Sequence, residues 1–235
     1  RARRLLAVRQ MADFTQTSIE ILGSESVYGA NAAKAASRAR EVVLKLGAMH
    51  PEEKALELFA REVAPAASAM AQGLTGFFAG RPAVQPVVRL YSFLWPKSAV
   101  TPVVEIGGAA HEVRFDPVPA AEGRFEPEPQ QSAERGGSNA TAKVPLVALA
   151  VGRSGDKGNT ANIGLIARKP SYLPFIKAAL TADRIKTWFA HCGVTRVDRF
   201  DLPGMSALNY VLHDALGGGG VASLRIDPQG KAFAQ

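Results

Sequence analysis

The segment LAVGRSGDKGNTANIGLIAR, residues Leu149–Arg168, carries the strongest structural signal in this 235-residue chain. Two short apolar runs, Val144–Val151 and Asn162–Ala167, flank a polar stretch rich in glycine. Short apolar runs bounded by glycine-containing turns are typical of β-strands. The segment therefore predicts two neighbouring strands joined by a polar loop over residues 152–162.

The residues that follow extend this pattern into a small domain. The order predicted after the two strands is a helix over about Ser171–Ala190, a strand over Val194–Phe200, a helix over Ser206–Leu216 and a strand over Val221–Ile226. Ser206 follows a glycine and is a residue type favoured at helix N-caps. Four strands and two helices, one layer of each, predict a ferredoxin-like α+β sandwich over residues 144–235.

Upstream, residues 1–118 are predicted to form an α/β portion of a larger domain, joined to the sandwich by a flexible linker over 119–143. The linker is rich in Pro, Glu, Gln, Ser and Gly and lacks apolar periodicity. The elements expected before it are strands over 17–22, 42–46 and 86–94, a helix over Pro51–Met70 that Pro65 kinks or ends, and a hairpin that joins 103–106 to 112–115 through Gly107 and Gly108.

Composition excludes several classes of protein. The hydrophobic fraction is 47%, yet no apolar run reaches the roughly 18 residues that a membrane span needs. A single cysteine, Cys192, excludes an internal disulfide framework and a cysteine-rich zinc module, and no metal site is predicted. We therefore expect a cytoplasmic protein that does not enter a membrane.

The charge favours a small anionic ligand over nucleic acid. The net charge is +7, and cations exceed acidic residues most strongly in residues 144–235. These cations are not clustered in a stripe interleaved with aromatic residues, which a nucleic-acid surface would require.

The polar loop is the densest group of candidate site residues. Its glycines and cations are suited to a phosphate or a carboxylate, because consecutive backbone N–H groups in such turns can surround an anion. Asp156, Lys157 and Ser154 are the catalytic candidates, with Asp156 as acid or base. The candidate ligand-binding residues in the loop are Arg153, Gly155, Gly158, Asn159 and Asn162. The alternative is a purely structural hairpin connection.

A second candidate is the run Gly217–Gly220, of which Gly217 is explained as a helix C-cap. The other glycines imply the close approach of a backbone, a ligand or a moving loop, and Gly218 and Gly219 are taken as ligand-binding candidates. His213, predicted on a helix, is more typical of a surface histidine than of a catalytic base.

Three stretches resemble one family. The stretches are Gly152–Arg168 (GRSGDKGNTANIGLIAR), Phe200–Gly220 (FDLPGMSALNYVLHDALGGGG) and Ser223–Lys231 (SLRIDPQGK), which resemble the carboxy-terminal ferredoxin-fold domain of the acyclic terpene utilisation (AtuA-type) family. Residues 6–29 and 80–97 resemble the end of the larger amino-terminal domain of that family. The family is associated with bacterial breakdown of acyclic terpenes, alongside acyl-CoA carboxylases and other acyl-CoA enzymes.

The resemblance implies a role in acyclic terpene or branched-chain acyl-CoA catabolism, in which the chain binds or acts on an acyl-CoA or a related carboxylate. A CoA thioester is then the expected ligand. The alternative is a non-catalytic assembly module that forms a homo-oligomer or docks on an acyl-CoA carboxylase or another partner. Whether the chain is an enzyme stays open at this point.

Overall fold

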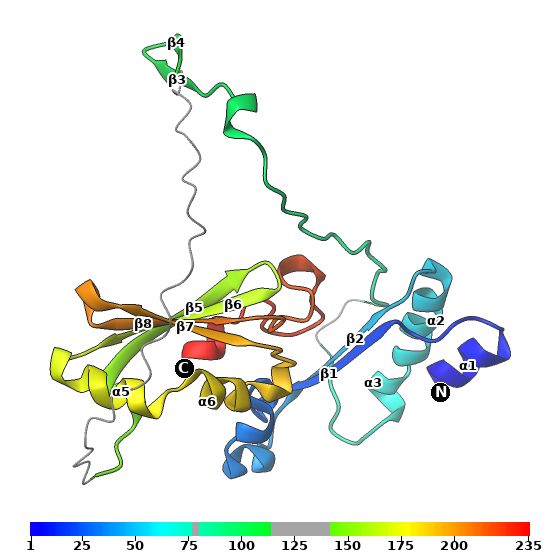
Figure 1. Cartoon of the computed structure of the whole chain (residues 1–235). Coiled ribbons are helices and arrows are strands. Elements are labelled where there is room, and N and C mark those ends of the chain that lie inside the picture. Colours follow the sequence, from blue (N-terminus) through cyan, green and yellow to red (C-terminus); the bar gives the residue numbers. More distant parts are fainter. Residues whose placement is uncertain (77–79, 114–141) are drawn as a thin grey trace. The chain divides into compact units, whose positions relative to one another are not determined.

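The computed structural model describes residues 1–76, 80–113 and 142–235 (Figure 1). They fall into two units: described residues of Arg1–Arg89 with Arg135–Gln235, and described residues of Leu90–Glu134. Helices and mainly antiparallel strands alternate along the chain, which confirms the predicted α+β class. The predicted linker over 119–143 lies outside the described residues except for its last two, so the domain boundaries stay predictions.

A four-stranded sheet forms the main body of the first unit. Its order is β5-β6-β8-β7, and every neighbouring pair is antiparallel. Two short helices, α5 and α6, lie along one side of it (Figure 1). The predicted layer of strands and layer of helices are therefore both present. The elements are β5 (Ala150–Lys157), β6 (Thr160–Ala167), α5 (Leu173–Ala179), α6 (Ala182–Trp188), β7 (Val197–Leu202) and β8 (Ala207–Leu212).

The core of this unit comes from the alternation of side chains along the central strands. In β8, Leu208, Tyr210 and Leu212 are fully buried, whereas Asn209 and Val211 between them are only partly covered. Successive residues of a strand point to opposite faces, so one face of the sheet meets the helices and the other does not. Ile176 of α5 and Ile185 of α6 complete the core on the helical face.

The order of the predicted elements is wrong in the last part of the chain. The predicted helix over Ser206–Leu216 is the strand β8, and the structure describes no strand over 221–226, where only the 3₁₀ turn Gly220–Ala222 forms. Ser206 adopts a left-handed conformation with φ of 50° after the turn that joins β7 to β8, so it is not a helix N-cap. The period of two at 208, 210 and 212 outweighs the capping signal, because it buries three large side chains together.

Two other predictions need smaller corrections. The helix expected over about 171–190 is interrupted at Leu180, and Thr181 caps α6 by accepting a hydrogen bond from the Arg184 N–H. The first strand was expected from Val144, but a single helical turn, α4 (Leu146–Leu149), precedes β5.

The amino-terminal part of the same unit follows the predictions more closely. Strands β1 and β2 pair antiparallel, as the patterns at 17–22 and 42–46 predicted. Helix α2 ends two residues before Pro65, as expected from the missing N–H of proline. Leu6 of α1 packs against Ala55 and Leu58 of α2. The elements are α1 (Ala2–Val8), β1 (Gln16–Leu22), β2 (Val43–Met49), α2 (Glu53–Val63) and α3 (Ala66–Ala69).

The second unit contains one hairpin among its described residues. Strand β3 (Val103–Ile106) pairs with β4 (Ala109–Glu112), and the turn uses Gly107 and Gly108, both with positive φ. The hairpin is confirmed, although β4 begins earlier than predicted and residue 115 lies outside the described range. The prediction of a strand over 86–94 is wrong, because these residues, all of them described, pair with no other strand in the described part of the chain.

Candidate functional site

The predicted polar loop is a strand pair rather than a loop. Its residues belong to β5 and β6, in a register that runs from Gly152 opposite Leu165 to Lys157 opposite Thr160. Only Gly158 and Asn159 form the connecting turn. Successive N–H groups of a strand point to opposite edges, so those of residues 152–157 do not converge on one anion as the prediction required.

The strand geometry sorts the predicted site residues onto two faces of the sheet. Ser154 lies opposite the buried Ile163, and Asp156 lies opposite the buried Ala161, so both belong to the face that meets the helices. Arg153 lies opposite Gly164 on the other face, where its side chain is exposed. The structure therefore does not bring the Asp156 carboxylate and the Arg153 guanidinium together.

Ser154 binds the carboxy-terminal segment, which ends in a 3₁₀ turn over Lys231–Ala234. Its hydroxyl donates to the Lys231 carbonyl oxygen at 3.1 Å and accepts from the Ala234 N–H at 3.1 Å. The Lys231 ammonium lies 3.8 Å from an Asp156 carboxylate oxygen. Ser154 is only 7% exposed, so its hydroxyl already serves as both donor and acceptor inside the fold.

Lys157 and Gly155 have separate surroundings. The exposed Lys157 ammonium donates to the backbone carbonyl of Asp156 at 2.9 Å, not to its carboxylate. A Cβ at Gly155 would lie 3.1 Å from the Lys231 Nζ, which is the end of a flexible side chain that can move aside.

The two glycine-rich candidates meet each other. Asn159, in the β5–β6 turn, accepts a hydrogen bond from the Gly218 N–H at 2.8 Å and donates to an Asp214 carboxylate oxygen at 3.1 Å. A Cβ at Gly219, whose φ is +72°, would collide with the Gly158 carbonyl oxygen. The structure thus brings Gly158, Asn159, Gly218 and Gly219 together, and the close approach of a second backbone explains the glycine at 219.

The sheet face away from the helices combines polar and apolar groups. Asn162 donates to the Asn209 side-chain oxygen at 3.3 Å, and Arg153 lies in the same cross-strand row as Gly164 and Asn209. The next row is apolar and joins Val151, Ile166, Ala207 and Leu202. Val151, Ile166 and Leu202 are each about two fifths exposed. We call this surface, from Val151 and Arg153 across to Leu202, the open face.

His213 lies after β8 and not on a helix, so its predicted placement is wrong. Its Nε2 lies 2.7 Å from an Asp198 carboxylate oxygen and 2.9 Å from the Arg196 guanidinium. Cys192 is buried, and burial raises the pKa of its thiol, which lowers its reactivity. Within the described ranges, no group of three or more His, Cys, Asp or Glu side chains is arranged to hold a metal ion.

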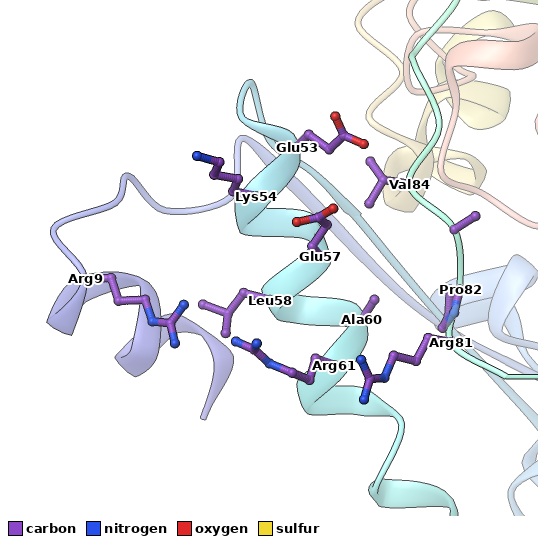
Figure 2. Close-up of a pocket in the computed structure, with 11 residues that line it drawn as sticks. Arg9, Glu53, Lys54, Glu57, Leu58, Ala60, Arg61, Arg81, Pro82 and Val84 are labelled. Atoms are coloured by element: carbon purple, nitrogen blue, oxygen red, sulfur yellow. The ribbon is translucent and has the colours of Figure 1, made fainter.

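A pocket of about 580 Å³ contains residues that the sequence analysis did not select (Figure 2). Arg9, Arg61 and Arg81 line it, with Leu58 and the segment 82–84. Each arginine taken alone is typical of a solvated surface. The sequence holds no signal that they meet, because α1, α2 and the segment after residue 80 are brought together only by folding.

Comparison with known proteins defines the family. No curated protein and no solved structure matches the chain. No helix in the part of the chain that the structure describes is long and apolar enough to span a membrane. Residues 1–106 match the model of the acyclic terpene utilisation family protein AtuA, and residues 144–235 match the AtuA ferredoxin-like domain. Four antiparallel strands backed by two helices agree with that domain type. The chain therefore belongs to the AtuA family, whose description links it to acyclic terpene utilisation.

Proposed function

We propose that this chain serves acyclic terpene breakdown by binding an anionic branched-chain intermediate, an acyl-CoA or the related carboxylate, on the open face. The observation that carries the proposal is the pairing of an exposed guanidinium, that of Arg153, with an adjacent exposed apolar row. Family membership supports the terpene-derived class of ligand.

The two rows suit the two ends of such a ligand. Arg153 can offer a charge-assisted, two-pronged hydrogen bond to a carboxylate or phosphate, and the amides of Asn162 and Asn209 supply neutral hydrogen bonds beside it. A branched hydrocarbon chain would cover Val151, Ile166 and Leu202. Each CH₂ removed from water contributes about 0.8 kcal/mol, so a short branched chain adds useful affinity.

The geometry supports binding better than catalysis. Asp156, the candidate acid or base, and Ser154 lie on the opposite side of β5 from Arg153. A reacting group held by Arg153 would therefore be separated from them by the strand. If the chain is catalytic, we propose Asp156 as the acid or base, with Lys157 and Ser154 beside it. The substitution Asp156→Asn tests this role, and an unchanged rate of turnover would refute it.

The binding proposal is tested by calorimetric titration with a branched acyl-CoA, its free acid and CoA. Arg153→Gln should weaken the binding of the free acid about tenfold or more. Lys186→Gln, which removes the same charge from the exposed side of α6, is the matched control and should change little. Ile166→Ser should weaken the acyl-CoA but not CoA. Equal effects of Arg153→Gln and Lys186→Gln would overturn the proposal.

The second candidate function is assembly, favoured by the same apolar row. Val151, Ile166 and Leu202 are exposed apolar side chains in one row of the sheet, although the small Ala207 between Ile166 and Leu202 is buried. A second copy of the chain could cover this row to give a homo-oligomer. Sedimentation across micromolar concentrations tests it. A dimer that Leu202→Glu converts to a monomer supports assembly, whereas a monomer at every concentration rejects it.

A further inference from the structure

The arginine pocket lies in the amino-terminal part of the first unit, on other residues than the open face. Helix α2 supplies Arg61, and Arg9 stands directly after α1, whose Leu6 packs against Ala55 and Leu58 of α2. Arg81 comes from the opposite wall. Figure 2 shows Arg9 and Arg61 turned toward each other below Leu58, with Arg81 reaching toward the foot of α2.

The three guanidiniums have no carboxylate partner among the described residues. Glu57 precedes Arg61 by four residues on α2, a spacing that favours an ion pair, yet no such pair forms. Figure 2 shows the Glu57 carboxylate turned toward Val84 instead. Glu53 and Glu57 line the same pocket, but with Lys54 the lining holds four cations against two carboxylates. The excess positive charge is unfavourable, and a bound anion would relieve it.

Neighbouring arginines show that partners are within reach elsewhere on the same helices. Arg1 pairs with Glu62 at 2.6 Å, and Arg3 pairs with Asp13 at 3.2 Å. Arg4, on the exposed surface of α1, has no carboxylate partner among the described residues either. What distinguishes the pocket is therefore that three such guanidiniums line one cavity.

The lining indicates the class of anion. Three planar guanidinium forks offer more donors and more charge than one carboxylate can use, whereas a diphosphate presents two groups of oxygens and a charge of at least −2. Leu58, Pro82, Ala83 and Val84 form an apolar wall in the same pocket. A volume of about 580 Å³ lies in the range of small-molecule sites.

We propose that this pocket binds an organic diphosphate, held by Arg9, Arg61 and Arg81, with its organic part against Leu58 and the 82–84 wall. Both CoA and an isoprenoid diphosphate contain such a group. The inference does not depend on the open-face proposal, because the two sites share no residue.

The test is calorimetric titration of the full chain with inorganic pyrophosphate at 150 mM salt. We expect saturable binding that Arg61→Gln and Arg81→Gln each weaken at least tenfold. Arg4→Gln is the matched control, because it removes the same charge from the exposed surface of α1 without lining the pocket. Glu57→Gln should strengthen binding severalfold, since it removes a negative charge from the lining.

Several outcomes would overturn the inference. The first is the absence of saturable pyrophosphate binding to the folded wild type. The second is a loss of affinity in Arg4→Gln equal to that in Arg61→Gln. The third is inorganic phosphate binding as tightly as pyrophosphate. Melting temperatures show whether each variant is folded, and Arg81→Gln, outside any helix, keeps the test valid if Arg61→Gln unfolds. The same titrations identify which ligand carries the diphosphate. If CoA binds more tightly than pyrophosphate and Arg61→Gln abolishes that binding, the ligand is CoA. If geranyl diphosphate binds more tightly, the ligand is an isoprenoid diphosphate. Because Arg153 is intact in these variants, failure here leaves the open-face proposal standing.

Discussion

Tyr210 is the largest fully buried side chain of the sheet, and its hydroxyl donates to the Leu180 carbonyl oxygen at 2.6 Å. Burial raises the pKa of Tyr210 to about 12, and the nearby Arg199 cation opposes that rise only in part. The phenol therefore holds its proton in the folded chain at a pH where the unfolded chain loses it. This single residue couples the stability of the sheet to alkaline pH.

The sign of that coupling gives a prediction. The pKa is raised on folding, so the stabilisation is complete below pH 10 and declines as the pH rises toward 12. Tyr210 alone should lower the unfolding free energy by about 1 kcal/mol between pH 9 and 11. Urea denaturation of the wild type and of Tyr210→Phe measures it: the variant should be less stable at pH 7 but less sensitive to pH. Tyr91→Phe, at an exposed tyrosine, is the control. A slope with pH that Tyr210→Phe leaves unchanged would contradict the assignment.

Gly219 offers a second test at the scale of one residue. Gly219→Ala places a side chain at φ of +72° and against the Gly158 carbonyl, so we expect a loss of about 2 kcal/mol or more. Gly220→Ala also has positive φ, but its added Cβ meets nothing within 4 Å, so its loss should be about 1 kcal/mol. Denaturant unfolding of both variants measures the difference, and equal losses would show that the contact with Gly158 contributes nothing.

Among the elements, the break between α5 and α6 depends on one capping residue. The Thr181 side chain accepts from the Arg184 N–H at 3.2 Å, which satisfies one of the first N–H groups of α6. Thr181→Ala should lower the unfolding free energy by about 1 kcal/mol, and Thr181→Ser should restore most of it. Thr187→Ala, which removes a hydroxyl from the last turn of α6, serves as control in the same denaturation series.

Much of the fold was predictable from local pattern. The strands at 17–22 and 42–46, the helix that ends before Pro65 and the glycine turn at 107–108 all follow from signals within one element. The strand at 207–212 was missed because Ser206 offers a capping signal and the apolar residues after it also fit a helical spacing. The pairing of β8 with both β6 and β7 decides between the two, and a local pattern does not reveal pairing partners.

The candidate sites were less predictable than the fold. Local sequence predicts a binding role for both Asn159 and Gly218, but the hydrogen bond between them joins residues 59 apart. Asp156 and Arg153 are close in the sequence and were predicted to share one site, although strand alternation places them on opposite faces. The arginine pocket depends on the packing of α1 against α2, which leaves no mark on the residues around Arg9 or Arg81.

At the scale of the whole chain, large apolar side chains among the described residues differ greatly in the fraction of their surface that is exposed to solvent. Leu90, Tyr91, Phe93 and Trp95 are each more than three fifths exposed and lie in backbone without a strand partner among the described residues. In residues 144–235, by contrast, Phe189 and Tyr210 are buried.

Among the described residues, brief digestion with chymotrypsin, which cuts after large hydrophobic residues, should therefore cleave first at residues 90–95. Mass spectrometry of the earliest fragments identifies the sites. First cuts at Phe189 or Tyr210 would contradict the burial of the sheet. Replacement of Tyr91 and Phe93 together by Ser is the control and should slow only the early cleavage.

The strand order also sets the timing of folding. The hairpins β5–β6 and β7–β8 each join neighbouring segments, and the β6–β8 ladder is the pairing that unites them in the described sheet. Local hairpins close within microseconds, whereas that ladder must wait until the chain containing α5 and α6 brings residues 161–166 to residues 207–212. We therefore expect Leu165 and Leu208, which face each other across the ladder, to control how fast the sheet forms, and residues near the outer strand β5 to control mainly how fast it opens.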